Sequence, residues 1–125
     1  MADEIIGKIF SKDEADKNFG PVLSSVSISS SELKALVSQS NKLVMFNVAG
    51  RKLSILKEGR AVLYPGGFSP KSDEKYASYS KSKVEELLNL GMSDTIIVEQ
   101  RKDVISVTNG LHTLETSDWC PPFCR

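Results

Sequence analysis

Basic side chains beside two predicted turns are the strongest candidates for binding chemistry in this 125-residue chain. Guanidinium and ammonium groups gathered at strand ends attract carboxylates and phosphates. We expect an acidic protein surface or the acidic part of another copy first, and a phosphorylated small molecule second. Nucleic acid ranks third, because stacking of single strands needs more aromatic side chains than this segment holds. The predicted partner-binding residues are Arg51, Lys52, Lys57, Arg60 and Tyr64.

The two cysteines, Cys120 and Cys124, lie within the last six residues. A structural zinc site needs four ligands, and the single histidine, His112, is predicted to lie in a strand, so we expect no metal site within one chain. Three residues separate the cysteines, whereas a thioredoxin-type redox motif has two. Passive thiols or a disulfide in the tail are favoured over a working redox pair, and intermolecular bridging is the remaining alternative.

Motifs typical of enzymes are missing from the sequence. It contains no Gly-x-Gly-x-x-Gly, phosphate-binding loop with Lys-Ser/Thr, Gly-x-Ser-x-Gly or His-Glu-x-x-His. No pair of carboxylates stands out as an acid–base couple, so catalytic residues cannot be assigned and no cofactor is expected. The sequence favours a non-enzymatic protein. The alternative is a small-molecule-binding protein or small enzyme with a pocket near residues 65–70, where Pro65-Gly66-Gly67 forms the one glycine-rich loop.

Charge is balanced overall but unevenly distributed. The chain has 16 basic and 16 acidic residues, and 40% of its residues are hydrophobic, as in ordinary globular proteins. Residues 1–21 carry 3 − 5 = −2, residues 22–72 carry 7 − 2 = +5 and residues 73–125 carry 6 − 9 = −3. No apolar run is long enough to cross a bilayer and no signal-like leader is visible, so a cytoplasmic protein without membrane contact is expected.

Three helices are predicted from capping residues and apolar spacing. Ser11 and Glu14 have capping-box spacing before a short polar helix over residues 12–19. Ser29 and Glu32 have the same spacing before an apolar stripe that predicts a helix at about 31–40. A third helix is expected to begin near Ser82, three residues before a glutamate, and to end at Gly91.

Strands are predicted before and after these helices. Alternating or β-branched runs identify them, and glycines mark the hairpin turns between them. Residues 43–48 carry apolar side chains on both faces, which indicates a central strand. The expected strands span 4–10, 24–29, 43–48, 53–56, 60–64, 76–80, 95–98, 104–107 and 111–115.

A shift of 51 residues superposes the two halves of the chain without a gap. The apolar stripe of the helix, the serine before the helix and the glycine of the second hairpin all recur at this offset, which favours an internal duplication. We divide the single domain, 1–125, into four parts: an N-terminal strand and short helix over 1–21, a first β-α-β-β-β unit over 22–72, a second over 73–118 and a Cys-Pro tail over 119–125.

The repeated β-α-β-β-β order is similar to the internal arrangement of a DNA sliding-clamp domain. The similarity is one of topology and rests on no sequence motif. Clamps present basic helices to DNA, whereas the second helix here carries Glu85 and Glu86. We therefore do not assign the chain to that family, and we do not expect nucleic acid as its partner.

The sequence predicts an α+β fold with two tandem units that form antiparallel sheet and place their helices on one face. If helices cover one face only, the second apolar face of the central strand needs another cover. A homodimer formed by sheet packing would supply it. The expected function is a protein-interaction or assembly module, with the chain itself as first partner and an acidic protein as second.

Overall fold

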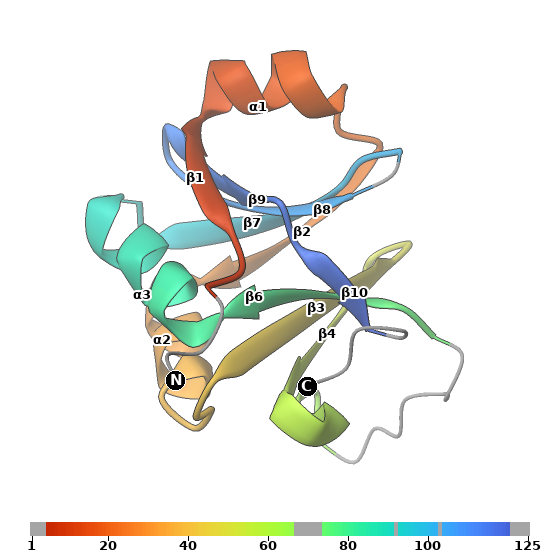
Figure 1. Ribbon diagram of the computed structural model, residues 1–125, viewed down its shortest axis with the longest axis vertical. Coiled ribbons are helices and arrows are strands. Elements are labelled where there is room, and N and C mark those ends of the chain that lie inside the picture. Colours follow the sequence, from red (N-terminus) through yellow and green to blue (C-terminus); the bar gives the residue numbers. More distant parts are fainter. Residues whose placement is uncertain (1–4, 67–73, 92, 103, 121–125) are drawn as a thin grey trace.

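The computed structural model describes residues 5–66, 74–91, 93–102 and 104–120. Over these residues the chain forms an α+β fold of two antiparallel sheets and three α-helices (Figure 1). No helix in the described ranges has the length and apolar character needed to span a bilayer. The helices are α1 (Lys12–Phe19), α2 (Ser30–Val37) and α3 (Lys81–Leu90). The strands are β1 (Lys8–Ser11), β2 (Ser24–Ser29), β3 (Leu43–Ala49), β4 (Lys52–Lys57), β5 (Ala61–Tyr64), β6 (Tyr76–Ser80), β7 (Thr95–Gln100), β8 (Ile105–Asn109), β9 (His112–Glu115) and β10 (Asp118–Cys120).

Each sheet takes strands from both halves of the chain. Sheet A has the order β1-β9-β8-β7-β2, and sheet B has the order β10-β6-β3-β4-β5. The predicted meanders are confirmed, because β3-β4-β5 and β7-β8-β9 pair in sequence order. The first strand of each predicted unit, however, joins the other unit: β2 pairs with β7, and β6 pairs with β3. The same element order thus occurs twice, while the duplication itself stays a prediction.

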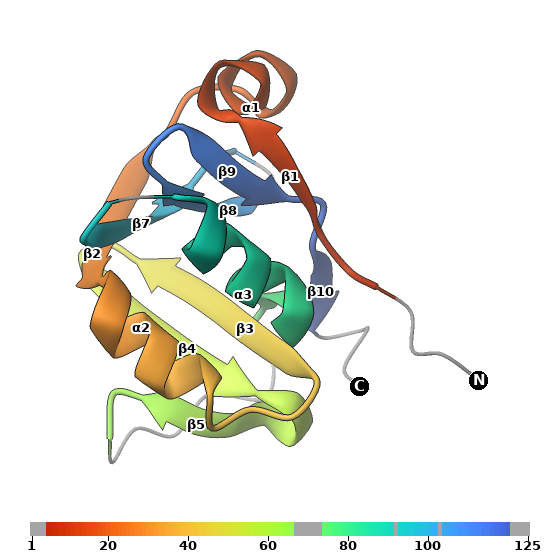
Figure 2. The same ribbon diagram turned by 90° about the vertical axis from the view of Figure 1, so that its left-hand side faces the viewer.

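The main core lies between the two sheets and the helix pair α2 and α3. These helices lie side by side along one side of the sheets (Figure 2). Leu33 and Val84 from the helices meet strand residues of both sheets, such as Phe46 and Leu114, in one buried cluster. Helix α1 lies elsewhere, over the opposite face of sheet A. The two unit helices, α2 and α3, therefore lie on one face as predicted, whereas α1, which precedes both predicted units, covers the other face of sheet A.

Strand β3 is central and covered on both faces, as predicted. Phe46 faces the main core, while Leu43 and Met45 belong to a second cluster with Ile6, Leu56 and Tyr76. Met45 is fully buried within the single chain. The N-terminal segment thus supplies part of the cover for which the sequence suggested a second copy, and the dimer packed face to face stays a prediction.

Serine residues begin the helices, but not all as predicted. Ser11 and Glu14 form a complete capping box at α1, and the Ser29 hydroxyl accepts a hydrogen bond from the backbone N–H of Glu32 at α2. Helix α3 begins after Ser80 rather than Ser82, and the Ser80 hydroxyl accepts from the N–H of Ile6 and not from its own helix.

The ends of two helices also differ from the pattern. Helix α2 ends at Val37, three residues before the predicted end, where the hydroxyls of Ser38 and Ser40 donate to carbonyls of the last turn. Helix α3 ends before Gly91 as predicted, but Gly91 has no positive φ. A Cβ at Gly91 would lie 2.1 Å from the side chain of Asn109, which approaches to donate a hydrogen bond to the carbonyl of Leu87.

Candidate functional site

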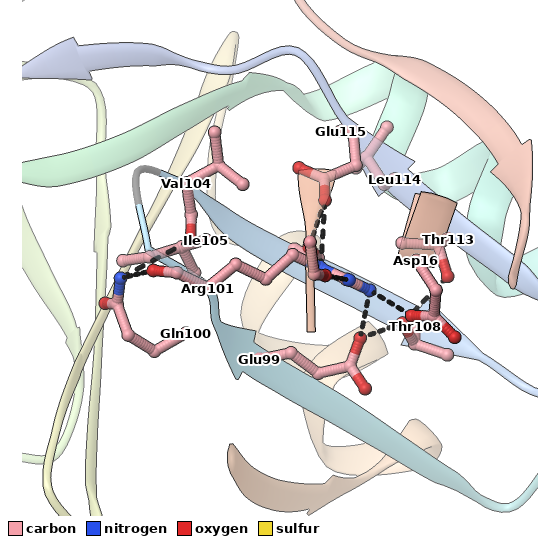
Figure 3. A network of polar contacts seen from close by, with 12 residues as sticks. Asp16, Glu99, Gln100, Arg101, Val104, Ile105, Thr108, Thr113, Leu114 and Glu115 are labelled. Carbon is pink, nitrogen blue, oxygen red and sulfur yellow. Dashed lines mark hydrogen bonds and ion pairs between the residues drawn. The ribbon is translucent and has the colours of Figure 1, made fainter. Parts of the chain in front are cut away.

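Ionisable and hydroxyl side chains gather on the outer face of sheet A, the face turned away from the main core. Alternate residues of β7, β8 and β9 point there, because neighbouring residues of a strand face opposite sides. Helix α1 covers this face and adds two charged side chains. We call the set the α1–sheet A network (Figure 3); it consists of Lys12, Asp16, Glu99, Arg101, Ser106, Thr108, Thr113 and Glu115.

Arg101 lies at the centre of the network and is fully buried. Its Nη2 lies 3.0 Å from Oδ1 of Asp16 and 3.4 Å from Oε1 of Glu99, and its Nε lies 3.3 Å from Oε2 of Glu115. Nε also donates to the Ser106 hydroxyl at 2.8 Å, and Nη1 donates to the carbonyl of Gly20. One guanidinium therefore joins strands β7, β8 and β9 to helix α1 and the residue that follows it.

Lys12 makes the second link between α1 and the sheet. Its Nζ lies 2.9 Å from Oε2 of Glu99 and 3.3 Å from Oδ1 of Asp16. Burial acts to raise the pKa of Asp16, but hydrogen bonds from Arg101 and Lys12 outweigh it and hold the pKa below its usual value. Phe10 and Phe19 also meet edge to face, with ring centroids 5.4 Å apart. Charged and aromatic contacts together seat α1 on sheet A.

Glu115 is the least satisfied member of the network. It is fully buried, and its Oε2 accepts from Ser106, but its Oε1 has no hydrogen-bond partner among the described residues. Burial raises the pKa of Glu115, with the Glu99 charge adding to the shift and Ser106 and Arg101 opposing it. With all groups ionised the network holds two positive and three negative charges. Protonation of Glu115 would balance it.

The network is built for structure rather than for access to a substrate. Thr108 donates to Glu99 at 2.7 Å and lies 2.9 Å from the hydroxyl of Thr113, so the hydroxyls also satisfy one another internally. A shallow hollow of about 60 Å³ lies between α2 and α3, lined by Lys34, Val37, Glu85, Leu88 and Asn89, on the other side of the sheet from these groups. Among the described residues, no group of three His, Cys, Asp or Glu is placed to hold a metal ion.

The predicted basic cluster is divided between the two ends of β4. Arg51 and Lys52 are exposed at the β3–β4 turn, whereas Lys57 ends the strand and Arg60 follows it. Lys57 is five positions after Lys52, which in a strand corresponds to about 16 Å. The four residues therefore do not gather into one patch, and binding of an acidic partner stays a prediction for each pair.

Two of the predicted binding residues contact the protein's own aromatic and apolar groups. The Arg60 guanidinium lies over the ring of Tyr76, 5.2 Å from its centroid. Tyr64, the last residue of β5, is half-buried and packs against the main core. Between Lys57 and Arg60, the carboxylate of Glu58 accepts hydrogen bonds from backbone N–H groups of residues 41–43.

The remaining predicted sites fall in the C-terminal half or at the edge of the described chain. His112 begins β9 and is partly buried. Cys120 ends β10, which pairs with β6, so the segment predicted as a tail begins with a strand. Cys124 lies outside the described residues, as does much of the 65–70 loop where a pocket was predicted.

Sequence reasoning missed the α1–sheet A network. The signal was present as alternation: Glu99 on one strand and Arg101 just after its end, Ser106 and Thr108 on the next, and Thr113 and Glu115 on the third. Such alternation normally marks a solvated sheet face. Only the position of α1 shows that this face is covered.

Comparisons of the chain with protein-family models, curated proteins and solved structures find no match.

Proposed function

We propose that the protein is a non-enzymatic assembly module that associates with another copy of itself through a sheet edge. The proposal rests on a contrast within sheet A between its buried ionisable groups and the uncharged strand at its edge. The buried ionisable groups of sheet A contact one another beneath α1. Strand β2, by contrast, is the last strand of sheet A and consists only of Ser, Val and Ile.

An open strand edge can bind another strand through its backbone groups. Alternate residues direct their N–H and C=O groups away from the sheet, and another strand can pair with them. Charges, prolines and irregular pairing normally prevent such pairing. The sequence-based expectations of an acidic partner and of a cytoplasmic location are separate predictions that this proposal does not need.

The test is the mass of the untagged protein in solution, measured by sedimentation equilibrium over a wide concentration range with reductant present. We expect a reversible shift from 13.7 kDa toward twice that mass as concentration rises. Reductant separates this association from bridging through cysteines. A mass of 13.7 kDa at every concentration would refute self-assembly.

A further inference from the structure

The four edge strands of the two sheets differ in how well they are protected from pairing. Strand β1 carries the exposed Lys8, β10 has three residues, and β5 has four residues and an irregular register against β4. Strand β2 has six residues and pairs regularly with β7 along its whole length. It is the longest of the four edges, pairs without irregularity and, like β5, carries no charged residue, which is the type of edge most open to pairing with another strand.

The register against β7 shows which groups of β2 face outward. The N–H of Ser30 donates to the carbonyl of Asp94, and from this pair every second residue of β2 is bonded to β7. Ser24, Val26 and Ile28 therefore direct their backbone groups inward along the sheet. The backbone groups that face away belong to Ser25 and Ser27, together with the N–H of Ser29, whose C=O accepts the first hydrogen bond of α2.

The side chains of Ser25, Ser27 and Ser29 are exposed. They lie on the outer face of sheet A, beyond the part of it that α1 covers, because α1 contacts β1 and β9. Small uncharged side chains on this stretch present neither bulk nor like charge to an approaching strand. On the opposite face of the strand, Val26 is half-buried and packs only partly against the core.

We propose that two copies of the protein pair antiparallel through β2, with a two-fold axis beside Ser27, and so join their A sheets into one continuous sheet. The inference rests on the proposed self-assembly and names its interface. In this register Ser27 lies opposite Ser27 of the second copy, and Ser25 lies opposite Ser29. It pairs both backbone groups of Ser27 with those of Ser27 in the second copy and joins the N–H of Ser29 to the C=O of Ser25.

The side chains of this register are complementary to themselves. On the outer face, serine meets serine at each pair, so hydroxyls lie within reach of hydroxyls. On the inner face, Val26 of one copy lies opposite Ile28 of the other in the closer, non-hydrogen-bonded type of pair. The exposed part of Val26 would be buried against an apolar partner. A second copy therefore fits this edge in backbone, polar and apolar contacts together.

A charge at the axis tests the interface directly. In Ser27→Lys, two like charges face each other, and we expect the dimer dissociation constant to rise by about tenfold or more. Ala61→Lys places the same charge on the exposed first residue of β5, the edge of sheet B, and should leave the constant within about twofold. Both positions are exposed, so circular dichroism and thermal unfolding should show an intact fold for each variant.

Cysteine cross-linking tests the register in a Cys120→Ser, Cys124→Ser background. Opposed residues of a hydrogen-bonded pair have Cα atoms about 5.5 Å apart, within the range of a disulfide. Ser27→Cys should therefore form a covalent dimer under mild oxidation. Ser25→Cys should form little, because its counterpart in the second copy lies four residues along the strand, about 13 Å away.

The outcomes separate this inference from the proposed function. A wild-type dimer that is weakened by Ser27→Lys and trapped by Ser27→Cys supports both. A wild-type dimer that neither change affects overturns the β2 interface and leaves self-assembly standing. Equal trapping of Ser25→Cys and Ser27→Cys overturns the register. A wild-type monomer overturns both proposals.

Discussion

The outer faces of the two sheets are both covered by the N-terminal segment of the chain, but with opposite chemistry. On sheet A, α1 closes a network of ion pairs around the buried Arg101. On sheet B, Ile6 closes an apolar cluster that contains Met45 and Tyr76. Ile6 is held there by its N–H and C=O groups, which bond to the hydroxyl and the N–H of Ser80.

The transition between these two covers takes place at Gly7. Its φ is +117°, and an added Cβ would lie 3.0 Å from the side chains of Tyr79 and Leu114. Only glycine adopts this backbone conformation readily, and only glycine leaves room for both neighbours. The chain thereby passes from sheet B, where Ile6 packs, to sheet A, where β1 begins. One short segment thus contributes to the cover of both outer faces. Because one cover is ionic and the other is apolar, we expect pH to affect the contribution of the first to stability and not that of the second.

The largest effect should come from removal of the central cation. Arg101→Met leaves the buried carboxylates of Glu99 and Glu115 without it, and loss of one member of a buried ion pair costs about 3–5 kcal/mol. We expect the free energy of unfolding, measured in urea, to fall by that order at pH 7. The loss should shrink at low pH, where the carboxylates bind protons.

Arg51→Met is the matched control, because Arg51 is exposed in the β3–β4 turn. Its effect should stay within about 0.5 kcal/mol. Similar losses for both variants would contradict the structural role of the network.

A cavity on the other face should have a comparable but slightly smaller effect. Met45→Ala removes a fully buried side chain beneath Ile6, and such changes cost about 2–5 kcal/mol. The loss should be the same at pH 5 and pH 8, since no charge changes. Leu111→Ala, at a side chain that is 79% exposed, provides the control and should change the unfolding free energy by less than about 0.5 kcal/mol. A strong pH dependence for Met45→Ala would break the contrast between the two faces.

The smallest effect, and the one with opposite sign, should come from Glu115→Gln. Burial raises the pKa of Glu115 in the folded protein, so the folded state binds a proton more readily than the unfolded state. The wild type should therefore lose stability as pH rises from the ordinary glutamate pKa of 4.5 through the raised folded pKa. Glu115→Gln lacks this loss and should have the higher melting temperature at pH 8.

The two melting curves should converge below the ordinary pKa, where both states of the wild type are protonated. Scanning calorimetry from pH 4 to pH 8 makes the comparison. A lower melting temperature for Glu115→Gln at pH 8 would show that the Arg101 and Ser106 contacts outweigh the burial of the charge.

Local signals predicted the elements well where they depend on neighbouring residues. The Ser11 and Ser29 caps and the positive φ of Gly50, Gly59 and Gly110 arise within a few residues of chain. The start of α3 was misplaced: its N-cap, Ser80, makes no side-chain capping bond, and its hydroxyl accepts instead from Ile6, 74 residues away in sequence. A local pattern carries no information on such a partner.

The candidate sites show the same difference between local signals and contacts far apart in the chain. The basic residues of the first unit were correctly placed near turns, but their spread over both ends of β4 follows from strand length and hairpin pairing. The buried Arg101 network was not predicted. Its residues read as a solvent-facing side of a sheet, and burial of an arginine depends on carboxylates that come from α1 and β9.

The sequence by itself determined the helices, the hairpins and the two-sided central strand, because capping, glycine turns and apolar alternation act over a few residues. Tertiary structure alone decided that β2 pairs with the second unit and β6 with the first. It also decided that α1 covers a charged face and that Ile6 covers an apolar one. These choices depend on contacts between residues far apart in the chain. They are set by which partners satisfy buried charges and apolar surface in three dimensions.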